Sequence, residues 1–249
     1  MTGSERNIIT KGIILKSSVS GDQNRLFSFI SPDLGVERAL AYGGEKIKSR
    51  FCSTIVPFAD LKLFLYRDPK TNLYSIKDVA EPLIAENFKK ELKTIYLTAF
   101  FANVILNSLL DQFDYKKYYM LLKYSLELIE VYNDPVKAFL FFTTKLIVLH
   151  GQEIRYSCCR ECKRSDNTLF YSKGDYDIFC SDHISGDKIA INKPDAEVMD
   201  AFINLKYVEI KEMHYKLHDF EAIRIIQIHY IKKIYCNSLR NLDDIHLYF

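Results

Sequence analysis

The chain has 249 residues, of which 48% are hydrophobic and 14% aromatic, and its formal net charge is +2. This composition is ample for a globular core, and the length favours two domains. No charged and apolar leader opens the sequence, and the most apolar stretch, "IYLTAFFANVILNSLL", is too short to span a bilayer. We therefore expect a cytoplasmic protein, in which cysteines are thiols or metal ligands rather than disulfides.

The net charge conceals an uneven distribution along the chain. Residues 1–80 carry 12 basic and 8 acidic residues, a balance of +4, and the remainder has a balance of −2. A positive N-terminal third is expected of a part that binds a polyanion. A merely solvated surface explains the same excess equally well, so charge alone does not decide.

The first 80 residues are predicted to form β-structure. Short apolar runs recur about every ten residues, in "KGIILK", "RLFSFIS", "GVERALAY", "ADLKLFLY" and "LYSIKDV". Turn-forming residues separate them, among them Ser20-Gly21-Asp22, Ser31-Pro32-Asp33, Gly43-Gly44 and Arg67-Asp68-Pro69. Five short strands at this spacing predict a small, closed or nearly closed barrel, for which the five-stranded OB-fold is the natural candidate.

Within this region, residues 41–50 read "AYGGEKIKSR" and place glycines beside basic residues. A nucleotide-binding P-loop requires G-x-x-x-x-G-K-[S/T], and this stretch does not fit because Gly43 and Gly44 are adjacent and Glu45 follows them. The alternative is a tight turn at the glycines whose basic neighbours face a phosphate backbone.

The remainder, residues 81–249, is predicted to be a mainly helical domain. After Pro82 the apolar residues step by three and four, which indicates one face of a helix over about 88–109. Further helices are predicted over about 115–132, from Asp134-Pro135 to Gly151, from Pro194, and over about 220–234. The aromatic stripes of these helices are interpreted as bundle core.

A cysteine cluster interrupts the helical part, in a segment of about 157–186. Cys159-x-x-Cys162 and Cys180-x-x-His183 have the spacing of two zinc knuckles that face each other across a hairpin, "NTLFYSKGDYDIF". Three thiolates and one imidazole complete a closed tetrahedron, which predicts one structural zinc ion rather than a catalytic one. Cys158 is an alternative ligand.

The competing interpretation is that the cysteines are small, buried hydrophobic residues. This interpretation is favoured for Cys52 and Cys236. The fourth ligand is the open point, because His183 is also compatible with a surface position. No H-E-x-x-H, G-x-S-x-G or deaminase signature is present, so no catalytic residue is predicted and the chain is not expected to be an enzyme.

The order of these parts resembles the bacterial RecO recombination-mediator family, over nearly the whole chain. The stretch "KGIILKSSVSGDQNRLFSFISPDLG" resembles the opening strand, turn and second strand of that family, and "AYGGEKIKSRFCSTIVPFADLKLFLY" resembles its small-residue loop and "KSR" element. "FTTKLIVLHGQEIRYSCCREC" resembles the segment before its zinc hairpin, and "IHYIKKIYCNSLRNL" its last helix. The family commonly has four cysteines, where this chain offers His183 in the fourth place.

The resemblance implies a nucleoid-associated mediator of DNA repair and homologous recombination in the RecF pathway. Such a protein binds single- and double-stranded DNA, anneals strands and, with RecR, helps to load RecA onto single strands coated by SSB. It also implies binding of the acidic C-terminal tail of SSB, for which we expect the helical bundle to carry an apolar pocket rimmed by basic residues. Candidates by helix position are Lys116, Lys117, Lys123, Lys232 and Lys233.

Annealing needs no covalent chemistry, only the neutralisation of two polyanionic strands. In an extended chain, Lys46, Lys48 and Arg50 lie on one face about 6–7 Å apart and contact phosphates without reading sequence. Four further basic residues extend this predicted DNA-binding surface around the barrel: Lys11, Lys16, Arg25 and Arg38. Three aromatic residues are candidates for base stacking or for the core: Phe27, Phe29 and Tyr42.

Two other classes of function remain open. The first is a zinc-ribbon adaptor that scaffolds protein partners without binding DNA. The second is a metal-dependent enzyme in which Cys180 or His183 belongs to an open site. Salt-dependent binding to single strands separates a mediator from an adaptor, and metal-dependent turnover identifies an enzyme.

Overall fold

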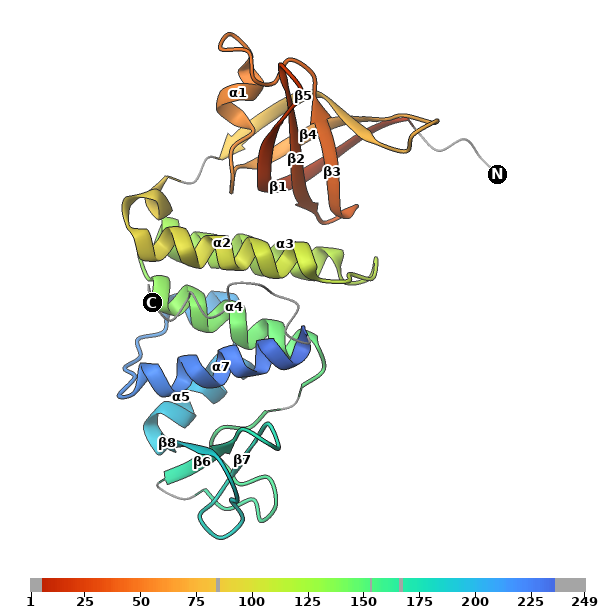
Figure 1. Ribbon diagram of the computed structural model, residues 1–249. Coiled ribbons are helices and arrows are strands. Elements are labelled where there is room, and N and C mark those ends of the chain that lie inside the picture. The colour runs from red at the N-terminus through yellow and green to blue at the C-terminus, as the bar shows by residue number, and fades with distance from the viewer. Residues whose placement is uncertain (1–5, 84–85, 153, 166–167, 236–249) are drawn as a thin grey trace. The chain divides into compact units, whose positions relative to one another are not determined.

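A computed structural model describes residues 6–83, 86–152, 154–165 and 168–235 (Figure 1). The chain divides into two compact units, the first running to Asn133 and the second beginning at Asp134. The predicted boundary at residue 80 lies close to the end of the last barrel strand at Leu83. The boundary between the two compact units lies further along the chain than the predicted one. This is because the two helices that follow the barrel contact its strands and belong to the same unit.

Five strands form a closed barrel in the first unit: β1 (Asn7–Ser20), β2 (Asn24–Ser31), β3 (Gly35–Ala41), β4 (Asp60–Arg67) and β5 (Tyr74–Leu83). Their order around the barrel is β1-β2-β3-β5-β4. Neighbouring strands are antiparallel except at the closure, where Ala39 and Leu40 of β3 pair in parallel with Tyr74 and Ser75 of β5. This topology confirms the predicted five-stranded OB-fold.

The barrel core follows from alternation along the strands, because successive side chains of a strand point to opposite faces. On β4, Leu61, Leu63 and Leu65 are buried in the core, whereas the residues between them are half-buried on the outer face. Gly12 of β1 allows a close approach, since a Cβ there would lie 2.6 Å from Cδ1 of Leu63. The predicted stacking candidates Phe27 and Phe29 also belong to this core.

Helices of the first unit follow the barrel: the 3₁₀ turn η1 (Asn87–Lys90), α2 (Leu92–Asn107) and α3 (Tyr115–Glu130). Asp60 at the start of β4 accepts hydrogen bonds from Tyr119 Oη at 2.9 Å and Lys123 Nζ at 2.8 Å on α3. At Gly35, which has φ of +73°, a Cβ would lie 2.5 Å from the Tyr115 ring. These contacts explain why α3 packs with the barrel as one unit.

The second unit contains α4 (Pro135–Leu149), α5 (Lys193–Asn204), α6 (Tyr207–Glu212) and α7 (Phe220–Ile234). Side chains of Asp134, Asn192 and Asp219 cap α4, α5 and α7, each accepting a backbone N–H of the first turn. The helices confirm the expectation of a mainly helical remainder. Among the described residues, no helix is long and apolar enough to cross a membrane.

A three-stranded sheet in the second unit has the order β7-β6-β8, with β6 (Thr168–Ser172), β7 (Asp177–Phe179) and β8 (Lys188–Asn192). Strands β6 and β7 form the predicted hairpin, which turns at Gly174 and Asp175. Strand β8, which pairs with β6, was not predicted. Figure 1 shows the sheet at one end of the second unit, and contacts join β8 to α5 and α7.

Candidate metal centre and nucleic-acid interface

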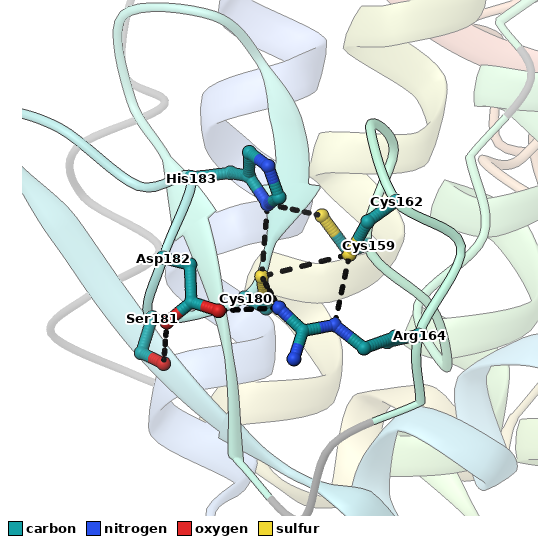
Figure 2. A network of polar contacts seen from close by, with 7 residues as sticks. All are labelled: Cys159, Cys162, Arg164, Cys180, Ser181, Asp182 and His183. Atoms are coloured by element: carbon teal, nitrogen blue, oxygen red, sulfur yellow. Dashed lines mark hydrogen bonds and ion pairs between the residues drawn. The ribbon is translucent and has the colours of Figure 1, made fainter.

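The four predicted zinc ligands converge in the second unit. The Sγ atoms of Cys159, Cys162 and Cys180 and a ring nitrogen of His183 all lie within 4.8 Å of one another. His183 Nδ1 lies 3.1 Å from Cys180 Sγ and 3.8 Å from Cys159 Sγ, and the Cys162 and Cys180 sulfurs are 3.8 Å apart. Figure 2 shows these side chains pointing toward one another from two loops.

Two tight turns bring the ligands together. In the first turn, Arg164 O accepts the Cys159 N–H at 2.9 Å and Cys159 O accepts the Lys163 N–H at 3.0 Å, with Lys163 at a φ of +61°. In the second, Cys180 follows β7 directly and its carbonyl accepts the His183 N–H at 3.1 Å. The β6–β7 hairpin returns the chain between them, so each turn supplies two ligand atoms to one point.

This geometry fits a tetrahedral zinc ion. With Zn–S bonds of about 2.3 Å, the sulfurs of a tetrahedral site stand ~3.8 Å apart, which is close to the Cys162–Cys180 separation. Three thiolates and an imidazole are a donor set that zinc prefers, and four protein ligands leave no position for water. Cys159, Cys162, Cys180 and His183 Nδ1 would hold the ion, which would fix the two turns rather than activate a substrate.

Arg164 is a feature of the centre that the sequence analysis missed. Its Nε lies 3.4 Å from Cys162 Sγ, its guanidinium lies 3.7 Å from Cys180 Sγ, and it forms an ion pair with Asp182 (Figure 2). The hydrogen bond from Arg164 lowers the pKa of the Cys162 thiol to about 6. Because zinc with three thiolates and a neutral imidazole carries one net negative charge, this guanidinium would oppose the excess charge of a bound ion.

The remaining cysteines lie elsewhere. Cys158 is half-buried and is not among the residues that converge, so its neighbour Cys159 is the candidate ligand of this turn. Cys52 is half-buried in the short helix α1 (Arg50–Thr54) of the first unit, rather than buried as an apolar core residue. Cys236 lies outside the described residues.

The loop that carries Lys46 and Lys48 is not extended, which corrects the predicted alternating row. Residues 42–49 form successive turns, and α1 begins at Arg50 because the Ser49 side chain accepts the Phe51 N–H and caps it. Lys46 and Lys48 are exposed, and between them Ile47 has 98% of its surface exposed. The loop thus presents two cations and one apolar side chain to solvent.

Arg50 and Arg25 have partners within the first unit. Arg50 forms an ion pair with Asp78, although more than half of its side chain is exposed. Arg25 Nε donates to Glu45 Oε1 at 2.6 Å, which raises the pKa of Arg25 and lowers that of Glu45, and Arg25 Nη1 donates to the carbonyls of Cys52 and Ile55. Only 14% of the Arg25 side chain is exposed, so it holds the loop rather than facing solvent.

The other predicted cations occupy two places on the barrel. Lys16 of β1 and Arg38 of β3 both lie opposite Ser28 of β2, so these exposed side chains share the outer face of three adjacent strands. Lys11, further toward the start of β1, pairs with Lys62 of β4, the strand on the opposite edge of β1 from β2. The structure therefore brings Lys16 and Arg38 near each other and keeps Lys11 apart from them.

Four residues on the outer face of β4 and β5 were missed. Half-buried Phe64 and Tyr66 alternate with the core leucines of β4, and Lys62 Nζ and Lys77 Nζ lie 5.9 Å and 5.0 Å from the respective ring centroids. The alternation in "DLKLFLYR" was the signal, since it places Lys62, Phe64 and Tyr66 on one face. Aromatic rings with neighbouring cations are the elements of a single-strand stacking surface. Tyr42, the third predicted stacking candidate, is 66% exposed.

The fold and the two sites define an OB-fold protein joined to a helical domain with a Cys₃His hairpin. A family model described as recombination protein O N terminal matches residues 5–82, and one described as recombination protein O C terminal matches residues 89–243. The chain therefore belongs to the recombination protein O family, which has a role in DNA repair and recombination.

Curated relatives agree with this assignment over most of the chain. The chain is similar to the DNA repair protein RecO of Caldanaerobacter subterraneus subsp. tengcongensis, at 26% identity over 84% of this chain and 85% of that protein. It is similar to the DNA repair protein RecO of Caldicellulosiruptor bescii, at 25% identity over 95% and 96%, and to that of Bacillus cereus, at 22% over 84% and 80%. The resemblance inferred from the sequence motifs is confirmed.

Proposed function

We propose that the protein is a recombination mediator that binds single- and double-stranded DNA, anneals complementary strands and, with RecR, helps to load RecA onto SSB-coated strands. The observation that carries the proposal is the family match to both halves of the chain. The protein acts without covalent chemistry, because annealing requires charge neutralisation and access to the bases. It works in the cytoplasm at the nucleoid, in the RecF pathway.

The outer surface of the barrel supports strand binding. Lys46 and Lys48 in the exposed loop, together with Lys16 and Arg38 across β1–β3, offer cations to phosphates of any sequence. The rings of Phe64 and Tyr66 offer faces to bases, and stacking is tolerant of sequence because every base has a π-face. A protein that holds strands in this way leaves the pairing edges free for a complementary strand.

An apolar hollow in the first unit supports binding of the SSB tail. It encloses about 570 Å³ between β1, the Pro57–Phe58 turn and α2, with Lys16 and Lys89 among the residues around it. Such a site offers apolar surface to an aromatic side chain and cations to acidic neighbours. A second hollow beside Lys123 suits the tail less well, because Lys123 is paired with Asp60 and Glu127 and Glu130 also line it.

The metal centre has a structural role in this proposal. A closed Cys₃His zinc site holds the turns on either side of the β6–β7 hairpin, and it leaves no open position for a substrate. One zinc ion is expected for each chain.

The test is a titration of single-stranded DNA at several salt concentrations. Affinity should fall linearly with salt on logarithmic axes, and the slope for single strands is about −0.7 per phosphate contact. The double variant Lys46→Gln/Lys48→Gln should flatten the slope by roughly 1.4 and weaken binding equally on unrelated sequences. The matched control is Lys70→Gln/Lys90→Gln, which removes two exposed lysines of the first unit from other positions.

Three results would count against the proposal. A wild-type protein without salt-dependent strand binding would favour the adaptor, which scaffolds proteins and does not bind DNA. An unchanged slope in the Lys46/Lys48 variant would remove the loop from the interface. Metal-dependent turnover of a substrate would identify an enzyme instead.

A further inference from the structure

A polar hollow of about 620 Å³ lies in the second unit, beside the metal hairpin and apart from every residue assigned above to strand binding. Its walls come from four segments: the stretch after α4, the turn that carries Cys159 and Cys162, the turn between β6 and β7, and the C-terminal half of α7. Four cations line it, namely Arg155, Arg160, Lys163 and Lys233.

Among the described residues that line this hollow, the cations outnumber the acids, and the acids are already engaged. Asp177 is held by Arg160 Nη1 at 2.5 Å, and Asp175 accepts the Ser172 hydroxyl at 2.6 Å. Within the described parts of the chain, Arg155, Lys163 and Lys233 have no carboxylate at ion-pair distance. Three cations around one concave surface repel each other unless an anion joins them.

Two of the cations are held in place. Lys233 Nζ lies 4.2 Å from the centroid of the Tyr176 ring, and this ring is stacked on His229 at 4.6 Å. The Tyr230 hydroxyl donates to Tyr176 O at 2.5 Å, which anchors the turn where Tyr176 has a φ of +56°. Lys163 Nζ donates to the carbonyl of Arg160. Cations that are already ordered lose less conformational entropy when an anion binds.

The lining favours phosphate over an apolar ligand. Guanidinium and ammonium groups donate to phosphate oxygens, while an apolar side chain would find few apolar partners among these charged and hydroxyl-bearing residues. We propose that this hollow binds phosphodiester groups of a nucleic-acid strand, through Arg155, Lys163 and Lys233. This inference rests on the proposed function, since it assigns a second strand-binding site to a protein that anneals strands.

A second strand site has a direct consequence for annealing. With one site on the barrel and another on the second unit, a single chain can bind two strands at once. Annealing would then depend on both sites, and phosphate contacts at both sites would contribute to the salt dependence of single-strand binding.

The experiment compares three variants that each remove three positive charges. The hollow variant is Arg155→Gln/Lys163→Gln/Lys233→Gln, and all three residues are exposed. The control is Lys193→Gln/Lys206→Gln/Lys216→Gln, which removes exposed lysines of the same unit that do not line the hollow. A barrel variant, Lys16→Gln/Lys46→Gln/Lys48→Gln, provides the comparison with the first unit. Zinc content and thermal unfolding establish that each variant is folded.

The hollow variant should flatten the salt slope of single-strand binding by roughly 2, about 0.7 for each lost contact, and should slow annealing about tenfold. The control variant should match the wild type. Equal slopes in the hollow variant and the control would overturn the inference, even when the barrel variant weakens binding. A wild type that does not bind strands at all would refute the proposed function itself, so the two failures are distinguishable.

Two further measurements distinguish a nucleic-acid strand from other anionic ligands. Inorganic phosphate that raises the melting temperature of the wild type but not of the hollow variant, without any change in strand binding, would show a site for free phosphate and overturn the strand assignment. A glutamate-rich peptide whose affinity is lost in the hollow variant, with an unchanged DNA salt slope, would assign the site to an acidic protein instead.

Discussion

The barrel and the metal hairpin are two small β-structures of one chain that are stabilised in different ways. The barrel closes on itself, and its interior is filled by buried aliphatic and aromatic side chains such as Leu63 and Phe29. The hairpin sheet has strands of only three to five residues and carries the convergent ligands Cys159 and Cys180 beside it. The comparison teaches that a closed sheet encloses its own apolar core, whereas an open sheet of short strands depends on packing against helices and, at its turns, on the ligand cluster.

This difference makes the two regions separately vulnerable. A change that removes apolar contacts should affect the barrel without altering metal content. Loss of the metal should affect the hairpin without altering the barrel. The following predictions test that separation, from the largest expected effect to the smallest.

Removal of zinc should have the largest effect. In small zinc-binding peptides the metal contributes about 10–16 kcal/mol at neutral pH, because the site forms only when the chain folds. Chelation, or Cys180→Ser, should therefore make residues 157–186 sensitive to proteolysis while the barrel stays protected, as mass spectrometry of the fragments would show. Cys52→Ser is the control and should retain zinc. A hairpin that stays protected after zinc has been removed would contradict the comparison.

Leu63→Ala tests the converse case, in which the barrel is destabilised and metal content should stay unchanged. Leu63 is fully buried, and truncation of such a side chain costs about 2–5 kcal/mol through lost transfer energy and a residual cavity. Chemical denaturation should show this loss in the first unit, with one equivalent of zinc still bound. A parallel loss of zinc in the variant would mean that the two regions are not separate.

Arg164→Gln should weaken metal binding without destroying the site. The guanidinium Nε lies 3.4 Å from Cys162 Sγ and would oppose the net negative charge of zinc held by three thiolates and an imidazole. Loss of an outer group of this kind lowers metal affinity about tenfold or more. Competition with a chromogenic chelator measures the change, and Arg164→Lys should recover part of it. An affinity equal to that of the wild type would exclude the electrostatic role.

The smallest effect is expected at His229, where Tyr171 and Tyr176 contact the ring. Burial, and then nearby lysines, lower the pKa of His229, so the folded state favours the neutral imidazole. A depressed pKa supplies stability that is present above the unfolded pKa of about 6.5 and is lost as the pH falls.

The stability difference between wild type and His229→Gln should therefore be larger at pH 7.5 than at pH 5.5, by less than about 1 kcal/mol after screening by solvent. Urea denaturation at the two pH values measures it, with the exposed His214→Gln as control. A difference that grows at low pH would reverse the assigned sign.

Local patterns predicted much of the fold and of the metal centre. Alternating residues on β4 and the turn formers between strands indicate short strands at the spacing of a small barrel. The two C-x-x-C/H spacings identify four candidate ligands before any geometry is known. The paired spacing is informative because each knuckle is a short turn whose shape depends on few residues.

Other features depend on residues that are distant in the chain. The loop at Lys46 is folded into turns partly because Glu45 pairs with Arg25 of β2, and no local pattern reports that pair. Arg164 acquires its role only when Cys180 and Asp182 return beside it. The alternation of residues in the sequence indicates the outer aromatic face of β4. The cation beside the Tyr66 ring could not be predicted in this way, because Lys77 belongs to β5.

The parallel closure of the barrel imposes an order on folding. Hairpin contacts between β1, β2 and β3 are local, but Ala39 meets Tyr74 and Asn7 meets Tyr66 only after long loops have closed. Loop closure costs entropy before those contacts are made, so structures rich in non-local pairings fold slowly. During synthesis, β1 to β3 leave the ribosome before β4 and β5, so the barrel can close only when β5 has emerged.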